Sequence, residues 1–237
     1  MISVVVPAYN EARRLLPSLD QIIAFMDARR EEYEVIVVDD GSTDGTAQTV
    51  RSHCGAHPRL RVESYPENRG KGHAVRYGAE RARGDLILFT DADLSTPIAE
   101  LGRLLLAIEN GADIAIGTRA HPHSDVRVPQ PFYRDRGGKL FNVMVRLLLL
   151  PQLRDTQCGF KLFRRTTVLP LFRRMREERF AFDVELLYLA YHARLRIAEV
   201  PVVWIDSPDS RVHLRHALAA FLHLFRIRWR HRRAVRE

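Results

Sequence analysis

Short apolar runs alternate with helix-like stretches through the first half of this 237-residue chain, and this alternation constrains the fold more than any other feature. Such alternation is typical of βαβ units, in which parallel strands form a sheet covered by helices. Strands are predicted at residues 3–6, 34–38, 60–64, 86–90 and 114–116. Helices are predicted at residues 11–29, from Thr43 or Asp44 to 53, at 72–83, and from Pro97 onward.

A cluster of polar and glycine residues follows each of the five predicted strands. The clusters lie at residues 7–11, 39–42, 68–72, 91–93 and 117–119. In open α/β sheets, ligands bind outside the carboxyl ends of the strands. One such cluster is most simply a solvated loop, but five in equivalent positions predict a ligand pocket at one edge of the sheet.

The second half of the chain is less regular. We expect a helix at residues 133–150, a loop leading into a strand at 155–164, a helix at 181–193 and a strand at 197–205. Pro201 cannot donate a ladder hydrogen bond, so its strand is predicted at a sheet edge. With 46% hydrophobic residues, the chain can bury one sizeable core, and we place one domain at residues 1–210.

The positive charge is concentrated at the C-terminus. Residues 211–237 hold eight arginines against the single acid Glu237, which accounts for most of the net charge of +8. The body of the protein is nearly neutral, and this argues against a nucleic-acid partner.

Residues 211–237 predict an amphipathic basic helix. Apolar residues recur at helical spacing along one stripe: Leu214, Leu218, Phe221, Leu222, Phe225 and Trp229. Such a helix can lie in a lipid interface with its arginines on anionic headgroups. An ordinary helix docked on the domain fits the pattern equally well.

Cysteine usage and hydropathy bear on the compartment. Cys54 and Cys158 form no CxxC pattern, which argues against a zinc site or a disulfide framework and for a reducing compartment. The chain starts on an apolar strand without the shape of a signal peptide. The longest apolar run, residues 143–150, contains Arg146 and is too short to span a bilayer. We therefore expect a cytosolic or peripheral protein.

Asp91 and Asp93 form the sharpest chemical signal. Two carboxylates one residue apart at a strand end can bind a hard divalent cation such as Mg²⁺ or Mn²⁺, leaving positions open for diphosphate oxygens. An isolated Asp-x-Asp is more often an acidic turn. The other polar clusters beside it favour the metal site.

Other candidate groups stand in the remaining clusters. Asp39 and Asp40 supply acceptors suited to a base and ribose, while Asp44 fits a helix cap. Arg119 and Arg134 can bind phosphate oxygens in a bidentate way. The segment around Lys71 lacks the Gly-x4-Gly-Lys-Ser/Thr pattern, and no GxGxxG follows the first strand, so P-loop and dinucleotide-binding readings are rejected.

These strings together resemble the inverting GT-A glycosyltransferases of family 2. The resemblance rests on VVVPAYNE, VVDDGSTDGT, NRGKGHAVRYG, DADLSTP and GTR in this order. DTQCGFKLF, FAFDVELL and EVPVVW are similar to segments of dolichyl-phosphate β-glucosyltransferases and, more distantly, dolichyl-phosphate mannose synthases. The resemblance covers residues 2–206 and implies a GT-A fold, a Rossmann-like and mostly parallel sheet flanked by helices.

The resemblance also implies roles for individual residues. The donor nucleotide would be bound by Pro7, Tyr9, Glu11, Asp39, Asp40, Lys71 and Asp91. The metal would be held by Asp91, Asp93 and Ser95. Catalytic candidates are Asp91, Asp93, Arg119, Arg134, Asp155 and Asp183, with Gln157 and Glu185 on the sugar and acceptor side.

The general base is a point of departure from many relatives. Members that glycosylate sugars carry an ED-x-x-RW motif, and Phe182–Asp183–Val184–Glu185 stands here instead. A sugar hydroxyl needs a base, whereas a phosphate monoester is already anionic near neutral pH. Asp183 is therefore a possible base but not a required one, and a single displacement with inversion is expected.

The favoured function is transfer of a hexose, with inversion, onto polyprenyl or dolichyl phosphate at the cytoplasmic face of a membrane. UDP-glucose is the expected donor, with GDP-mannose possible. One alternative is a metal-dependent glycosyltransferase acting on a saccharide or small-molecule hydroxyl. Another is a catalytically dead membrane- or nucleic-acid-binding module, which the intact Asp91 and Asp93 argue against.

Overall fold

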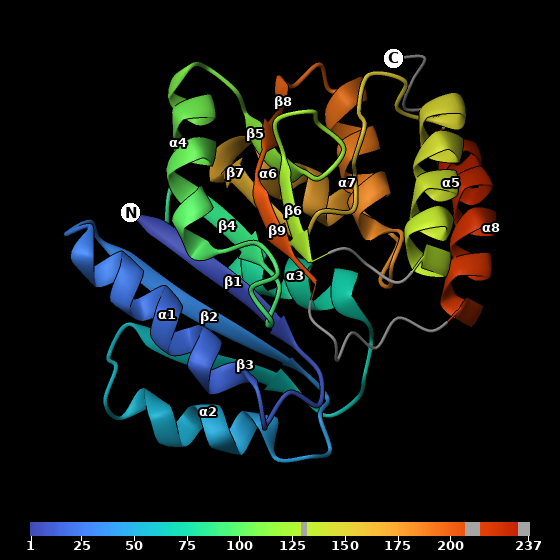
Figure 1. Cartoon of the computed structure of the whole chain (residues 1–237). Helices are drawn as coiled ribbons and strands as arrows, with labels where there is room; N and C mark the ends of the chain where they lie inside the picture. Colours follow the sequence, from blue (N-terminus) through green and yellow to red (C-terminus); the bar gives the residue numbers. More distant parts are fainter. Residues whose placement is uncertain (129–131, 207–213, 232–237) are drawn as a thin grey trace.

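The computed structural model describes residues 1–128, 132–206 and 214–231, except for the side chains of residues 132–135 and 214–221. Within these ranges a seven-stranded sheet runs in the order β3-β2-β1-β4-β7-β5-β8 (Figure 1). Its strands are β1 Ile2–Ala8, β2 Tyr33–Asp40, β3 Leu60–Tyr65, β4 Leu86–Thr90, β5 Ile114–Thr118, β7 Phe160–Arg164 and β8 Ile197–Pro201. The five predicted strands of the first half are confirmed.

Six strands of the sheet run parallel and β7 runs against them. β7 lies between β4 and β5 and is antiparallel to both, while β8 pairs in parallel with β5 at the sheet edge. The carboxyl ends of β1 to β5 therefore meet at one edge of the sheet. This arrangement brings the polar clusters of the first half together, as the sequence predicts.

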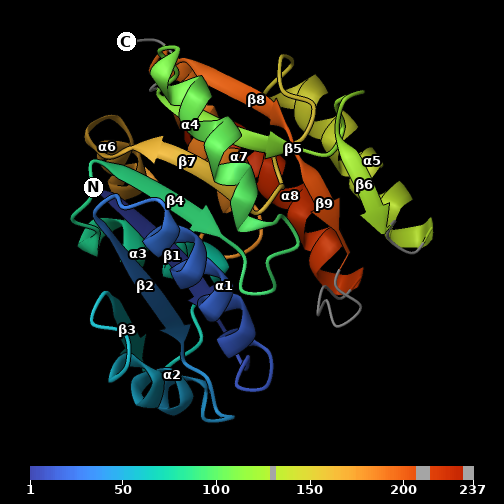
Figure 2. The ribbon, with the colours of Figure 1, turned by 60° about the vertical axis from the view of Figure 1, so that its left-hand side comes forward.

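Helices cover both faces of the sheet. One buried cluster lies under α1 Leu15–Ala28 and α4 Leu101–Glu109, which share a face in Figure 2. The other cluster lies under α3 Lys71–Arg81, α6 Arg165–Arg174 and α7 Phe182–His192. Strand β2 is buried on both faces, with Val35 and Val37 in the first cluster and Ile36 and Val38 in the second, as its apolar run predicts.

Several elements differ from the predictions. The first helix begins at Leu15 rather than residue 11, because the carbonyl of Glu11 accepts hydrogen bonds from Arg14 and Leu15 in a turn. The predicted strand at 197–205 is two strands. β8 ends at Pro201, and β9 Val203–Ile205 pairs instead with β6 Asp125–Val128 in a second small sheet. Helix α6 and strand β6 were not predicted.

Pro97 precedes a helical segment, as predicted, with η1 Ile98–Glu100 leading into α4. Asp44 stands at the start of α2 Thr46–Cys54, where its Oδ1 accepts a hydrogen bond from the backbone N–H of Thr46 at 3.0 Å. The N-cap position itself is Gly45 and no side chain caps the helix, so the predicted cap at Thr43 or Asp44 is wrong, although Asp44 binds the first residue of α2.

Helices α5 Phe132–Leu148 and α8 Leu214–Arg230 lie side by side at one end of the molecule (Figure 1). Leu224 and Ile227 of α8 are buried in the same core cluster as Phe141, Val145 and Leu149 at the α5 end. The described part of α8 is thus packed against the body of the protein. The division at residue 210 into two units stays a prediction.

Candidate active site

Asp91 follows β4 directly and is seated against β7. Its backbone N–H donates to the carbonyl of Gly159 at 3.1 Å. A Cβ at Gly159 would lie 2.0 Å from Oδ2 of Asp91, so a side chain at 159 is incompatible with this carboxylate position. Sequence reasoning missed Gly159, whose requirement appears only once β7 lies beside β4.

Asp91 faces the ammonium group of Lys71, the first residue of α3. Oδ1 of Asp91 lies 2.6 Å from Nζ of Lys71, as an ion pair without hydrogen-bond alignment. Burial alone would lower the pKa of Lys71, but Asp91 and Asp183 outweigh burial and raise that pKa. Lys71 is therefore held as a cation beside the Asp-x-Asp carboxylates.

The carboxylate pair fits a divalent metal. Oδ1 of Asp91 is buried and has no hydrogen-bond partner, and Oδ1 of Asp93 accepts one from the N–H of Ser95 at 3.1 Å. The cation beside Asp91 shows that the position favours positive charge. Hard oxygen donors are the ligands that Mg²⁺ and Mn²⁺ prefer.

A second lysine, Lys161, lies near Lys71 and, unlike it, is closed to solvent. Lys161 of β7 is fully buried, and its Nζ donates to the carbonyl of Cys158 at 2.6 Å and to Oδ1 of Asp183 at 2.5 Å. The ammonium groups of Lys71 and Lys161 lie 5.3 and 5.5 Å from the ring of Phe89. These contacts place Asp183 in one charged cluster with Lys161, Lys71 and Asp91.

Asp183 is held in this cluster by charge. Burial raises the pKa of Asp183, while Lys161 and Lys71 act against that rise. Sequence reasoning singled out Asp183 but missed its partner. The available signal was a lysine inside the apolar run Phe160–Arg164, where a charged residue needs a buried counter-ion.

Arg119 and Asp155 form a bidentate pair at the end of β5. Nε and Nη2 of Arg119 donate to the two carboxylate oxygens at 2.7 and 2.9 Å, and its backbone N–H adds a third hydrogen bond at 3.0 Å. Burial opposes ionisation of Asp155, yet Arg119 holds its pKa at about 2. The sequence predicted Arg119 and Asp155 as separate site residues, and the structure shows that they form one ion pair.

Three further residues surround this pair. Oε1 of Glu199 accepts hydrogen bonds from the backbone N–H groups of Arg154 and Asp155, each at 2.9 Å. The Arg119 guanidinium lies 5.4 Å from the Trp204 ring, and the N–H of Gln157 donates to Asp155 at 3.1 Å. Burial raises the pKa of Glu199. Glu199 was not predicted.

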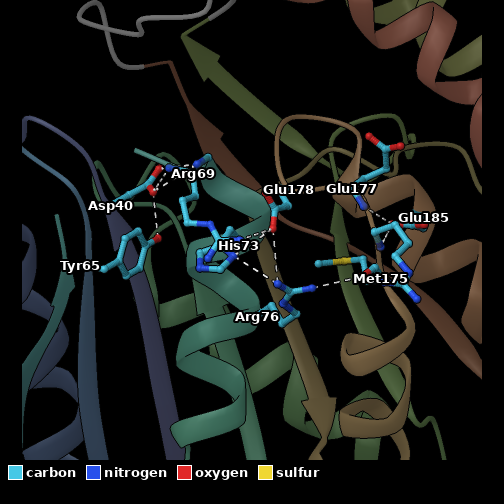
Figure 3. Close-up of polar contacts among 11 residues, drawn as sticks. Asp40, Tyr65, Arg69, His73, Arg76, Met175, Glu177, Glu178 and Glu185 are labelled. Carbon is cyan, nitrogen blue, oxygen red and sulfur yellow. Dashed lines mark hydrogen bonds and ion pairs between the residues drawn. The ribbon is translucent and has the colours of Figure 1, made fainter. Parts of the chain in front are cut away.

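Asp40 organises the loop that leads to Lys71 (Figure 3). Its oxygens accept hydrogen bonds from the hydroxyl of Tyr65, the amide of Asn68 and the backbone N–H groups of Arg69 and Gly70, at 2.8 to 3.2 Å. Burial, together with the hydrogen bond to Asp40, raises the pKa of Tyr65. The carboxylate of Asp40 is thus occupied within the chain, unlike the free acceptor that the sequence suggested.

The remaining donor-side residues lie at the ends of β1 and β2. Tyr9 is exposed, Pro7 and Asp39 are buried, and Glu11 is ion-paired with Arg14. Of the other predicted residues, the side chain of Arg134 lies outside the described residues. Glu185 is fully buried, with its oxygens bound to the backbone of residues 176 and 177 and to His231, so it is not among the side chains around Asp91.

Residues 3–170 match the family described as Glycosyl transferase family 2. The chain belongs to this family. Dolichyl-phosphate beta-glucosyltransferases are similar to the chain over most of its length. A dolichyl-phosphate beta-glucosyltransferase of Drosophila melanogaster is 43% identical over 224 residues, covering 89% of this chain and 69% of the relative. The Homo sapiens enzyme of the same name is 38% identical with the same coverage. The Saccharomyces cerevisiae enzyme is 35% identical over 231 residues, covering 90% of this chain and 69% of the relative.

Solved structures share the fold. A mannosyltransferase from Pyrobaculum calidifontis in complex with GDP-Man and Mn²⁺ superposes with a TM-score of 0.67 at 26% identity, covering 100% of this chain and 64% of that one. A glucosyl-3-phosphoglycerate synthase from Mycobacterium tuberculosis in complex with Mn²⁺ and UDP-Glc gives 0.68 at 20% identity, covering 95% and 76%. Both of these structures hold Mn²⁺ together with a nucleotide sugar. Among the described helices of the chain, none is both long and apolar enough to cross a membrane.

Proposed function

We propose that this glycosyltransferase moves glucose from UDP-glucose, with inversion, to dolichyl phosphate or a related polyprenyl phosphate. The observation that carries the proposal is the 43% identity to a dolichyl-phosphate beta-glucosyltransferase over 89% of the chain. The charged cluster around Asp91 suits the diphosphate end of such a donor. GDP-mannose is the second donor to test.

In this proposal Asp91 and Asp93, with Ser95 beside them, hold Mg²⁺ or Mn²⁺. When bound, the metal supplies positive charge against the leaving diphosphate. Lys71 adds a cation next to Asp91, at 2.6 Å. Tyr9 and Asp39 at the ends of β1 and β2 are proposed to bind the nucleoside, together with the nearby Pro7 and Glu11.

A phosphate acceptor explains how the site works without a dedicated base. A phosphate monoester has a second pKa of about 6 and is already anionic at neutral pH. Asp183 is ion-paired with Lys161 at 2.5 Å and so is better suited to fixing Lys161 than to receiving a proton. Arg119, oriented by Asp155, is proposed to bind the donor or acceptor phosphate with its remaining nitrogen, alongside Arg134 of α5 and Gln157.

The test is transfer of radiolabelled glucose from UDP-glucose to a short polyprenyl phosphate, scored in the organic phase after extraction. Asp93→Asn should remove at least about 99% of the label, because a metal ligand is lost. EDTA should have the same effect because it removes the metal itself. Asp85→Asn is the matched control, since Asp85 is an exposed acid at the opposite end of β4 from Asp91. Label transferred only to a soluble saccharide, with none in lipid, would contradict the proposal and favour a hydroxyl acceptor.

The same proposal places the enzyme on the cytoplasmic face of a membrane, through helices α5 and α8. Exposed apolar residues recur at i, i+3 and i+7 on both helices: Leu140, Val143 and Leu147, and Leu222, Phe225 and Trp229. The eight arginines of residues 211–237 complement an anionic lipid surface. Leu222, Phe225 and Trp229 belong to the stripe expected from the sequence.

Tryptophan fluorescence tests this surface directly. The chain has two tryptophans, of which Trp204 is buried and Trp229 is 73% exposed, so Trp204→Phe leaves Trp229 as the reporter. Vesicles containing phosphatidylserine should shift its emission to shorter wavelength, and neutral phosphatidylcholine vesicles should do so less. An unchanged spectrum with the anionic vesicles would reject this membrane surface.

A further inference from the structure

The loop between α6 and α7, residues 175–181, lies against the segment that carries Lys71 (Figure 3). The carbonyl of Glu178 accepts a hydrogen bond from the N–H of His73 at 3.0 Å. A Cβ at Gly70 would lie 2.6 Å from that same carbonyl, and one at Gly72 would lie 2.8 Å from the carbonyl of Glu177. The two backbones are therefore in direct contact on both sides of Lys71.

Side chains reinforce this contact. Oε1 of Glu178 lies 3.1 Å from the guanidinium of Arg69, 3.3 Å from Nδ1 of His73 and 3.5 Å from Nη2 of Arg76. Arg76 also donates to the carbonyl of Met175 at 3.2 Å. A shift of the 175–181 loop would consequently move the start of α3.

The opposite side of the same loop is fastened to α8 by two buried glutamates. Oε2 of Glu185 accepts the N–H groups of Arg176 and Glu177 at 2.7 and 2.6 Å, while its Oε1 lies 2.7 Å from Nε2 of His231. Glu177 is paired with Arg230 at 2.9 Å and with Nδ1 of His223. We call these five side chains, Glu177, Glu185, His223, Arg230 and His231, the α8 clamp.

Burial makes the clamp costly to open. Glu185 is 0% exposed and Glu177 is 4% exposed, so each carboxylate depends on its partners from α8. Removing a hydrogen-bond partner from a buried carboxylate leaves one of its oxygens unsatisfied, which costs free energy unless the surrounding chain moves. The segment attached directly to this carboxylate is the loop, whose backbone N–H groups at 176 and 177 bind Glu185.

We propose that the α8 clamp positions Lys71 beside Asp91, so that α8 sets the affinity of the nucleotide site in addition to facing the membrane. The path runs from His231 and Arg230 through Glu185 and Glu177 to the loop, and from the loop to Gly70 and Gly72. His223, Arg230 and His231 are positioning residues in this scheme, since they act through the loop. The inference rests on the proposed nucleotide-sugar site, but it requires neither the lipid acceptor nor the membrane.

The test measures UDP binding in the presence of Mn²⁺, without lipid, by isothermal titration calorimetry. His231→Ala should raise the Kd for UDP on the order of tenfold, the usual range for mutations that couple two sites. His231→Gln, whose amide can donate near the place of Nε2, should restore most of the affinity. Arg228→Ala is the matched control, because Arg228 is a neighbouring arginine of α8 that donates to Leu148 of α5 rather than to the clamp.

Unchanged UDP affinity in folded His231→Ala would overturn the proposal, even if its melting temperature fell. If His231→Ala does not fold, the two arginine variants take over the test. Arg230→Ala should then weaken UDP binding relative to Arg228→Ala, and equal Kd values for the two would overturn the proposal. A lipid acceptor that proves wrong would not affect these UDP-binding measurements, whereas wild-type protein that binds neither UDP nor GDP would reject the nucleotide-sugar site itself.

Discussion

Carboxylates are used differently in the two halves of the sheet. In the parallel half, residues 1–90, Asp40 and Asp44 accept hydrogen bonds from backbone N–H groups of the loops that follow the strands. In the mixed half, which contains β7, Asp155 is paired with the partly exposed Arg119 and Asp183 with the fully buried Lys161, each from a distant segment. Removing Asp40 or Asp44 leaves neutral amides behind, whereas removing Asp155 or Asp183 leaves a cation without its counter-ion. Removing an acid should therefore cost more stability in the mixed half.

Asp155→Asn should show the largest effect. Arg119, whose side chain is 25% exposed, would lose the buried counter-ion that holds it, and breaking a buried pair in this way costs up to about 3 to 5 kcal/mol of unfolding free energy. Urea unfolding at pH 7 measures this loss. Asp125→Asn is the control, since Asp125 forms an exposed pair with Arg127 in β6 and should cost less than about 1 kcal/mol. If Asp155→Asn and Asp125→Asn lose the same unfolding free energy, the burial of an ion pair does not decide its contribution to stability.

Acid should weaken the same pair in the wild-type protein. The pKa of Asp155 falls from its ordinary value of 3.8 to about 2 in the folded state. Its contribution, about 2 kcal/mol, is therefore complete above pH 4 and is lost as the pH falls through 2. The gap in unfolding free energy between wild type and Asp155→Asn should narrow over that range. If the difference in unfolding free energy between the two proteins stays constant down to pH 2, ionisation of Asp155 does not contribute to the stability of the wild type.

Asp40→Asn should have a smaller effect. The asparagine keeps one acceptor oxygen for the loop at residues 68–70 but loses charge-assisted hydrogen bonds, which costs about 1 to 2 kcal/mol. UDP affinity should fall along with stability, because this loop precedes Lys71. A loss as large as that of Asp155→Asn would break the proposed contrast between the halves.

Asp44→Asn should have the smallest effect, below about 0.5 kcal/mol, since Asn and Asp serve almost equally at helix starts. Its side chain is exposed and accepts hydrogen bonds from the N–H groups of Ala12 and Thr46. Thermal melting of this variant beside Asp40→Asn ranks the two acids of the parallel half. A larger loss at Asp44 than at Asp40 would show that burial does not set the order.

The contrast also explains which parts of the fold could be predicted. In the parallel half, each strand is marked by its own apolar run and each helix by its own period, so local pattern was sufficient. In the mixed half, Val202 breaks one apolar stretch into two strands that join different sheets. No local pattern marks that change of partner. Helix α6, with Pro170 inside it, was likewise missed.

The candidate site divides in the same way. Asp91 and Asp93 could be selected from their place at a strand end. Gly159 and Lys161 could not, because their roles depend on β7 lying antiparallel beside β4. Glu185 was predicted on the acceptor side from its neighbour Asp183. On a helix, however, residues two apart point to different sides, and the two carboxylates join separate clusters.

The pairing of Lys71 and Lys161 around Phe89 has a consequence for chemical labelling. The chain contains only three lysines among its 37 basic residues, and the third, Lys139, is exposed on α5. Lys161 is closed to solvent, while the side chain of Lys71 is 30% exposed. Among the lysines, an amine-reactive reagent would thus find one accessible target at the site and one on the surface. Mass spectrometry of the two labelled peptides would follow occupancy of the site, with Lys139 as an internal standard.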